Sequence, residues 1–541
     1  MKKTKYILML SLSVLIINAT AQSVKWADEA ENASKIRASD MAGYTDKSVF
    51  LIKKTDQGEW GGDSKFFLDR YDLPNMNKIW TKEMWGTDDG TDKGKSLHIS
   101  NVYSLIDGVL VIALSHDFST VYAMQVRVED GVLLDSRKVT IGDMEAKNED
   151  QRKSAPFKFA MSKDRTTLLG YYVSRHSPTI HTIAIDANLN IKWKKDITPS
   201  FSNNDFDLKE ISSLDGNEIA ILASINDKGS DQKYKFVTIY YNHSKDSKFE
   251  TEMSLGGDKL IDGIKINMDA AGNPIAAGMY KNDGEKGLFG TFGFRINANT
   301  GQIMATSSAP FTTDFLTNFI SERKADKGKG IPYLQVNEIY VTADNSIVIA
   351  AERNTFSEEH TYWEPNNQNG MPTTVSYANS GPGMAASMHG GITTTYYNYK
   401  DIVLAKLDGK TCNTEWAIII PKKQTTDAKL KKSYGLTIQG STIFVAFCDN
   451  RKNADMDPKV FTQDASKLKT ADLDDNGKYL DMTLCTIDLG SGAVQRKYLT
   501  RYKEDDSKLV FNALSLIALP NSIYVYRGDK HTDQSGILTL Q

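Results

Sequence analysis

The sequence has little cysteine and no excess of charge of either sign. Its 541 residues include three cysteines, 65 basic side chains and 68 acidic side chains. So few cysteines exclude a fold held together by disulfides. We expect Cys412, Cys448 and Cys485 to be buried thiols, with a Cys448–Cys485 bridge as the alternative. Balanced charge removes the uniform attraction on which nonspecific binding to nucleic acid or anionic membranes depends, so neither is expected as a partner.

A long apolar run occurs only at the N terminus. Residues 1–5 are basic, 6–17 are mostly apolar, and 19–21 supply small residues before Gln22. This pattern predicts a signal peptide, 1–21, and export. No later stretch approaches the roughly 20 apolar residues of a membrane helix. We therefore expect the mature chain to be soluble and either periplasmic or extracellular. Because no cysteine stands near the cleavage site, we do not expect a lipoprotein.

The rest of the chain repeats one module: a turn, a short apolar run, and a hairpin whose far strand often carries a tryptophan. The apolar runs lie at 48–52, 109–114, 167–171, 218–222, 275–278, 346–350, 442–446 and 522–526. Turn residues such as Asp107-Gly108 precede each run. A long repeat built only of strand-length segments is typical of a β-propeller, in which each blade buries its faces against its neighbours around a ring.

The two ends of the chain complement each other. The eighth unit begins at Phe511 and ends after a third strand at 536–540, so it lacks its outermost strand. Near the N terminus, Val24-Lys25-Trp26 matches the outer-strand pattern Ile191-Lys192-Trp193. We predict an all-β, single-domain propeller over 22–541, with eight four-stranded blades closed by the N-terminal strand. Seven blades is the alternative, if 39–55 does not form one.

Two stretches resemble known repeats. Residues 267–278 contain Asp-x-x-Gly-Asn-x-x-x-x-Gly, which is similar to the core of bacterial propeller repeats. Residues 401–416 resemble the Asp-x-x-x-x-Lys-Leu-Asp…Trp hairpin of the same repeats and of quinoprotein-like propellers. The resemblance to bacterial exported β-propeller repeat proteins spans most of the mature chain as a pattern. It implies the fold and an exported scaffold role, but no chemistry.

The long connections fall on one face of this expected ring. If the strands of a blade are A to D, the A–B and C–D turns share one face and the B–C and D–A connections the other. We predict loop insertions at 312–333, 353–400 and 449–480, all on the B–C and D–A face, where binding is then expected. Residues 28–40 and 312–323 are expected to form helices on that face.

The 353–400 insertion is rich in aromatic residues. We predict a recognition loop with candidate ligand-binding residues His360, Tyr362, Trp363, His389 and Tyr396. A soft-metal site at Met384, Met388 and His389 is a second interpretation. The third is an excursion that packs its own aromatic side chains.

The 449–480 insertion contains the start of a calcium-loop pattern. Asp472, Asp474 and Asn476 alternate before Gly477, as oxygen ligands of Ca²⁺ do. The match is incomplete, because Thr483 stands where an EF-hand loop has a bidentate Glu. A solvated acidic turn is the alternative, and no other cofactor is predicted.

No catalytic motif stands out. The eight histidines show no His-x-x-x-His spacing, and adjacent cysteines and repeated Ser-x-Asp-x-Gly-x-x-Trp turns are missing. We therefore name no catalytic residue and favour a noncatalytic scaffold that binds an envelope or extracellular protein. A glycan or small-ligand binder is the first alternative. A propeller hydrolase or lyase with residues drawn from several blades is the second.

Overall fold

The computed structural model describes most of the mature chain. The described residues are 24–31, 36–55, 66–85, 97–115, 120–143, 157–174, 177–202, 206–226, 234–362, 373–377, 391–427, 429–454, 456, 467–473, 480–499, 510–511, 517–519, 522–528 and 532–539. The expected signal peptide lies outside them. Within them nearly all regular elements are strands, which confirms the all-β class.

Four sheets are single four-stranded antiparallel meanders. The first three contain β11 (Lys158–Met161), β12 (Leu168–Val173), β13 (Ile180–Ile185) and β14 (Ile191–Ile197); β15 (Phe206–Ser212), β16 (Glu218–Asn226), β17 (Tyr234–Asn242) and β18 (Ser247–Met253); and β19 (Lys259–Met268), β20 (Pro274–Asn282), β21 (Gly290–Ile296) and β22 (Ile303–Pro310). The fourth contains β29 (Gly435–Gln439), β30 (Thr442–Asn450), β32 (Leu480–Asp488) and β33 (Val494–Tyr498).

The three larger sheets are also built from four-stranded antiparallel meanders, with further strands added. One joins β3 (Ile36–Thr45), β4 (Ser48–Thr55), β5 (Phe66–Asp72) and β6 (Lys78–Met84) to β7 (His98–Leu105), β8 (Gly108–Leu114), β9 (Thr120–Val126) and β10 (Leu133–Asp143). Another contains β23 (Leu334–Val341), β24 (Ile347–Tyr362), β26 (Gly391–Leu407) and β27 (Thr414–Ile420), with β25 (Thr373–Tyr377), β28 (Gln424–Thr426) and β31 (Ala471–Asp472). The last contains β34 (Val510–Phe511), β35 (Ile517–Leu519), β36 (Ser522–Gly528), β37 (Thr532–Thr539), β1 (Val24–Trp26) and β2 (Ala30–Glu31).

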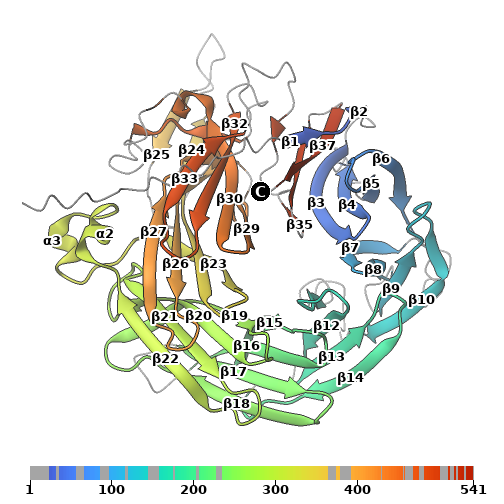
Figure 1. Cartoon of the computed structure of the whole chain (residues 1–541), viewed down its shortest axis with the longest axis horizontal. Helices are drawn as coiled ribbons and strands as arrows, with labels where there is room; N and C mark the ends of the chain where they lie inside the picture. Colours follow the sequence, from blue (N-terminus) through green and yellow to red (C-terminus); the bar gives the residue numbers. More distant parts are fainter. Residues whose placement is uncertain are drawn as a thin grey trace, which may run out of the picture.

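The sheets follow one another around a common axis in chain order, so the chain is a β-propeller (Figure 1). The repeated apolar runs of the sequence are the second strands of the meanders, such as β8. This strand is buried along almost its whole length, because neighbouring blades cover both of its faces.

The number of blades stays a prediction. Among the described strands, a count of sheets gives seven, whereas a count of meanders gives eight. The difference arises because β3 and β7 share one parallel bridge, Gly43 to Ser104, which merges two meanders into one sheet.

The apolar core is divided into layers between neighbouring blades. In one layer, Phe50 and Leu68 from the β3–β6 meander pack with Val109 and Met124 from the β7–β10 meander. In another, residues of β12–β14 pack with residues of β15–β17. Each blade is therefore stabilised by its two neighbours rather than by one central core.

Outer-strand tryptophans connect adjacent blades. The indole N–H of Trp80 in β6 donates to the Val128 carbonyl at 3.0 Å, and that of Trp416 in β27 donates to the Leu489 carbonyl at 3.1 Å. Both acceptors belong to the C–D turn of the next blade. These turns contain Gly131 (φ +74°) and Gly492 (φ +71°), and a Cβ there would approach the indole rings to 2.9 Å and 3.0 Å. Glycine thus permits both the left-handed backbone and the close approach.

The N-terminal strand closes the ring, as predicted. β1 pairs antiparallel with β37, with Val24 opposite Leu538 and Trp26 opposite Gly536. The Ala27 N–H donates to the Ser535 carbonyl at 3.0 Å. Figure 1 shows the blue N-terminal strand beside the red C-terminal strands.

Both helix predictions need correction. The described part of 28–40 contains β2 and the start of β3, because residues 30–31 pair with β37 and residues 36–40 pair with β4. Residues 312–323 contain two short helices, α2 (Thr313–Thr317) and α3 (Glu322–Ala325), instead of one. The Asn318 side-chain amide donates to the Asp314 and Phe315 carbonyls, so it competes with the backbone N–H groups that would continue α2.

The cysteines are buried thiols, as expected. Cys448 lies opposite Met482 and Cys485 opposite Val445, so the two are not cross-strand partners. Burial raises the pKa of Cys412 to about 11 and that of Cys485 to about 12, which disfavours reactive thiolates. No helix among the described residues is long and apolar enough to cross a membrane.

We predict that deleting residues 22–27 destabilises the whole propeller. The deletion removes β1 and the Trp26 ring, which packs 4.1 Å from the Arg527 guanidinium. The expected loss is roughly 3 kcal/mol, or about 3 °C in Tm by calorimetry. The Lys25→Ala variant should leave the Tm unchanged because this side chain is exposed. An unchanged Tm after the deletion would refute the closure.

Candidate functional site

Two of the expected insertions, 353–400 and 449–480, converge with the connection at 421–433 in one accessory sheet. β24 and β26 are 16 and 17 residues long, and both extend beyond their blade. Their outer parts pair with each other, β25 pairs with β24, β28 with β26, and β31 with β28, in the order β25-β24-β26-β28-β31. We call residues 354–362, 373–377, 391–399, 424–426 and 471–472 the accessory sheet. It lies on the B–C and D–A face.

The predicted loop at 353–400 therefore needs correction in its described parts. Residues 353–362 and 391–400 continue the strands of the blade instead of forming irregular loops. Residues 363–372 and 378–390 lie outside the described part of the chain.

The structure brings some predicted site residues into the accessory sheet. His360 and Tyr362 are backbone members of β24, opposite Thr393 and Gly391. Tyr396 belongs to β26. The remaining predicted ligand-binding residues, Trp363 and His389, lie outside the described residues, as do Met384 and Met388.

Tyr396 lies among acidic side chains. Partial burial raises the pKa of its hydroxyl, and the hydrogen bond to Glu359 and the nearby carboxylates of Asp472 and Asp427 raise it further. The structure thus brings Tyr396 and Asp472 together, although 75 residues separate them in sequence. No residue signal predicts this, because it depends on the β26-β28-β31 pairing.

The calcium site stays a prediction. Asp472 is an exposed residue of β31, whereas Asp474 and Asn476 lie outside the described residues. Within the part of the chain that the structure describes, no three His, Cys, Asp or Glu side chains are grouped as metal ligands.

A buried ion pair anchors the accessory sheet to the ring. The Lys422 Nζ lies 2.6 Å from Glu352 Oε1, 2.7 Å from Gln424 Oε1 and 2.6 Å from Ser433 Oγ. The Gln424 amide also donates to the Cys448 carbonyl of the next blade at 2.7 Å. All four side chains are at most 1% exposed. Burial lowers the pKa of Lys422, while the Glu352 carboxylate opposes this shift. The network connects β24, β28 and β30.

Two exposed aromatic side chains lie in the accessory sheet or next to it in sequence and hydrogen bonding. Phe356 in β24 is 58% exposed and Tyr333, which precedes β23, is 57% exposed. Tyr333 has φ +61°, unusual for a residue with a large side chain, and its carbonyl accepts a hydrogen bond from the Asn354 N–H at 2.9 Å. Sequence reasoning did not identify either residue, since nothing in the pattern distinguishes them from core aromatics.

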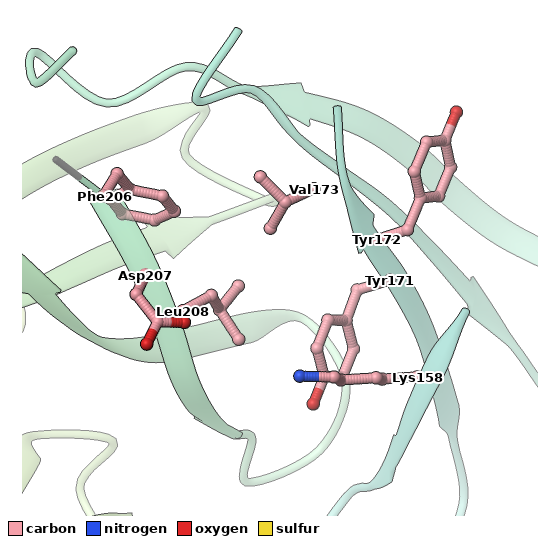
Figure 2. Close-up of a pocket in the computed structure, with 7 residues that line it drawn as sticks. All are labelled: Lys158, Tyr171, Tyr172, Val173, Phe206, Asp207 and Leu208. Carbon is pink, nitrogen blue, oxygen red and sulfur yellow. The ribbon is translucent and has the colours of Figure 1, made fainter. Parts of the chain in front are cut away.

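A pocket of about 210 Å³ opens between the β11–β14 and β15–β18 blades. It is lined by Lys158, Tyr171, Tyr172, Val173, Phe206, Asp207 and Leu208. Figure 2 shows the β12 residues on one side and the β15 residues on the other. The lining includes the end of a B strand and the start of an A strand, so the pocket lies on the same face as the accessory sheet.

The pocket has a polar end. Lys158 and Tyr171 are cross-strand partners in β11 and β12, so their side chains lie on the same side of the sheet. Burial raises the pKa of Tyr171 to about 12, with a further contribution from Glu210. Burial also raises the pKa of Glu210, which accepts a hydrogen bond from the Ile266 N–H at 3.2 Å.

One carboxyl pair lies on the opposite face, beside an A–B turn. Burial raises the pKa of Glu218 to about 7, and its neighbour Asp215, with which it shares a hydrogen bond, raises it further. Hydrogen bonds from Asn217 hold the pKa of Asp215 below its usual value, although burial opposes this. The two groups therefore titrate in different pH ranges.

Comparisons with known proteins give likenesses to solved structures, each at low sequence identity. No family model and no curated protein sequence matches the chain. The WD40 domain of SCAP from fission yeast is 8% identical, with 96% of this chain and 99% of that chain covered and a TM-score of 0.40. The polysaccharide lyase Uly1 is 10% identical, with coverages of 84% and 94% and a TM-score of 0.37. The β-propeller domain of the Trilobed protease from Pyrococcus furiosus is 8% identical, with coverages of 87% and 99% and a TM-score of 0.37. Likenesses this distant carry no argument about function.

We predict that Lys422→Met strongly destabilises the protein. The substitution leaves the Glu352 carboxylate buried without its ammonium partner, which typically costs about 3–5 kcal/mol. Denaturant unfolding should show this loss. The matched control is Lys423→Met at the neighbouring, partly exposed lysine, for which a change below about 1 kcal/mol is expected. Equal stability of the two variants would contradict the anchoring role.

We also predict that Glu218 makes stability pH-dependent. Between pH 4.5 and 7 the unfolded chain has released a proton that the folded chain retains, so stability falls as pH rises through this window. After allowance for solvent screening, the loss is on the order of 1 kcal/mol. Urea unfolding at pH 5 and pH 7.5 should show a smaller fall for Glu218→Gln than for the wild type. The same fall in both would show that Glu218 is not responsible.

Proposed function

We propose that this chain is an exported, noncatalytic β-propeller scaffold that binds a protein partner through the accessory sheet. The observation that carries the proposal is the convergence of three separate connections in one sheet. A loop that served only to connect strands would need no pairing with the connections of a neighbouring blade.

The buried ion pair makes this sheet a rigid platform. Lys422 and Glu352 are fully desolvated, and Gln424, which accepts from Lys422, donates to the Cys448 carbonyl of the next blade. A platform that is ordered before binding loses little conformational entropy on association, so contacts made on it translate more fully into affinity.

Phe356 and Tyr333 supply exposed aromatic rings that a partner protein can bury. Exposed aromatic side chains are enriched among the residues that dominate the energy of protein interfaces. The left-handed backbone of Tyr333 also indicates a conformation imposed by the surrounding structure, which is common at binding sites. Partner residues that form an apolar cavity for these rings would fit the surface.

The basic and apolar N-terminal segment supports an envelope or extracellular place of action. N-terminal sequencing of the natural protein tests this, since the mature chain should begin at Gln22.

We predict that Phe356→Ala weakens partner binding at least tenfold without unfolding the ring. The full-length protein, purified from the envelope fraction of its source cells, should carry a stoichiometric protein partner. The affinity for the purified partner, measured by calorimetry, should fall at least tenfold in Phe356→Ala and in Tyr333→Asn, because each removes an aromatic anchor. Asparagine is chosen at 333 because it tolerates positive φ.

Ile191→Ala is the matched control for this experiment. Ile191 is 41% exposed, but it lies beside a C–D turn on the opposite face. Its substitution should leave affinity unchanged, and all three variants should keep the wild-type Tm. Recovery of the natural protein without a partner, or full affinity in both aromatic variants, would overturn the proposal.

A further inference from the structure

The pocket between β12 and β15 has two chemically different ends. Tyr171, Val173, Phe206 and Leu208 belong to, or pack against, the apolar layer between the two blades, so the pocket opens above that layer (Figure 2). Phe206 and Val173 are only partly buried and keep apolar surface accessible. This end suits a flat, apolar ring face.

The other end presents two hydrogen-bond donors. Lys158 is exposed and has no ion-pair partner among the described residues, and its cross-strand neighbour Tyr171 carries a hydroxyl. The acidic group of the lining, Asp207, forms an ion pair with Lys209 instead. An ammonium and a neutral phenol side by side favour a ligand group that only accepts hydrogen bonds and carries negative charge.

The volume limits the ligand to one ring. Sites for drug-sized molecules usually occupy about 300–1,000 Å³. A cavity of about 210 Å³ is smaller than this range. A six-membered ring bearing one charged group is therefore a suitable size.

We propose that this pocket binds a small carboxylate attached to a six-membered ring. The carboxylate lies between the Lys158 ammonium and the Tyr171 hydroxyl, and the ring packs against Phe206 and Val173. The site is independent of the accessory sheet, which lies across the ring (Figure 1). Both aromatic acids and sugar acids share this chemistry.

Calorimetric titration of the full chain with benzoate and with glucuronate tests the proposal and separates the two sources. At least one acid should bind saturably at one site. Benzoate alone would identify an apolar ring, and glucuronate alone a sugar ring. The neutral analogues benzamide and glucose should bind at least tenfold more weakly than the corresponding acids.

Substitutions of the residues that line the pocket test whether the acid binds there. Lys158→Met should weaken the bound acid at least tenfold, because it removes the charge and keeps the aliphatic stem. Tyr171→Phe, which removes only the hydroxyl, should weaken it several-fold. Lys194→Met, at an exposed lysine on the outer strand of the same blade, is the control and should leave affinity unchanged. If Tyr171→Phe does not fold, the Lys158→Met result decides.

Two results would overturn the proposal. One is the absence of saturable binding of either acid. The other is binding that Lys158→Met leaves unchanged.

Discussion

Antiparallel pairing between β1 and β37 joins strands from opposite ends of the chain. The Gln534 side chain donates to the Ala27 carbonyl across 507 residues. This pairing converts a row of blades into a ring, so neither terminal sheet exposes its edge there. The entropy cost of closing such a long loop grows only slowly with its length, and an apolar layer between the first and last blades, with Leu51, Tyr71 and Tyr524, adds to the strand pairing. The layers between the other blades can form locally, whereas closure of the ring joins residues from the two ends of the chain.

Once the ring is closed, each blade needs only its neighbours. The Trp80 and Trp416 hydrogen bonds end at the C–D turn of the next blade, and each apolar layer likewise joins one blade to its neighbour. Because the short C–D turns accept these hydrogen bonds, the connections on the other face are not needed to hold neighbouring blades together. That face can therefore hold long insertions without weakening the ring.

The loop-rich face offers two kinds of binding surface. The accessory sheet is a broad platform with projecting aromatic rings, whereas the β12–β15 pocket is a small concavity with two donors at one end. Both occur where strands leave the packed layers between blades. There, side chains such as Phe356 and Lys158 are still positioned by strand geometry but remain exposed. Position and accessibility together make them useful for recognition.

The sequence alone determined the repeating strands, the face of the insertions and the closing role of Val24 to Trp26, because alternation, turn residues and the missing last strand are local patterns. It was wrong about 28–40, where pairing with β37 and β4 overrides helical composition. Only the tertiary structure decided that Tyr396 lies near Asp472, that Lys422 pairs with Glu352, and that Lys158 and Tyr171 share a pocket with Phe206 of the next blade. These contacts depend on the register and order of strands distant in sequence, which residue types do not encode locally.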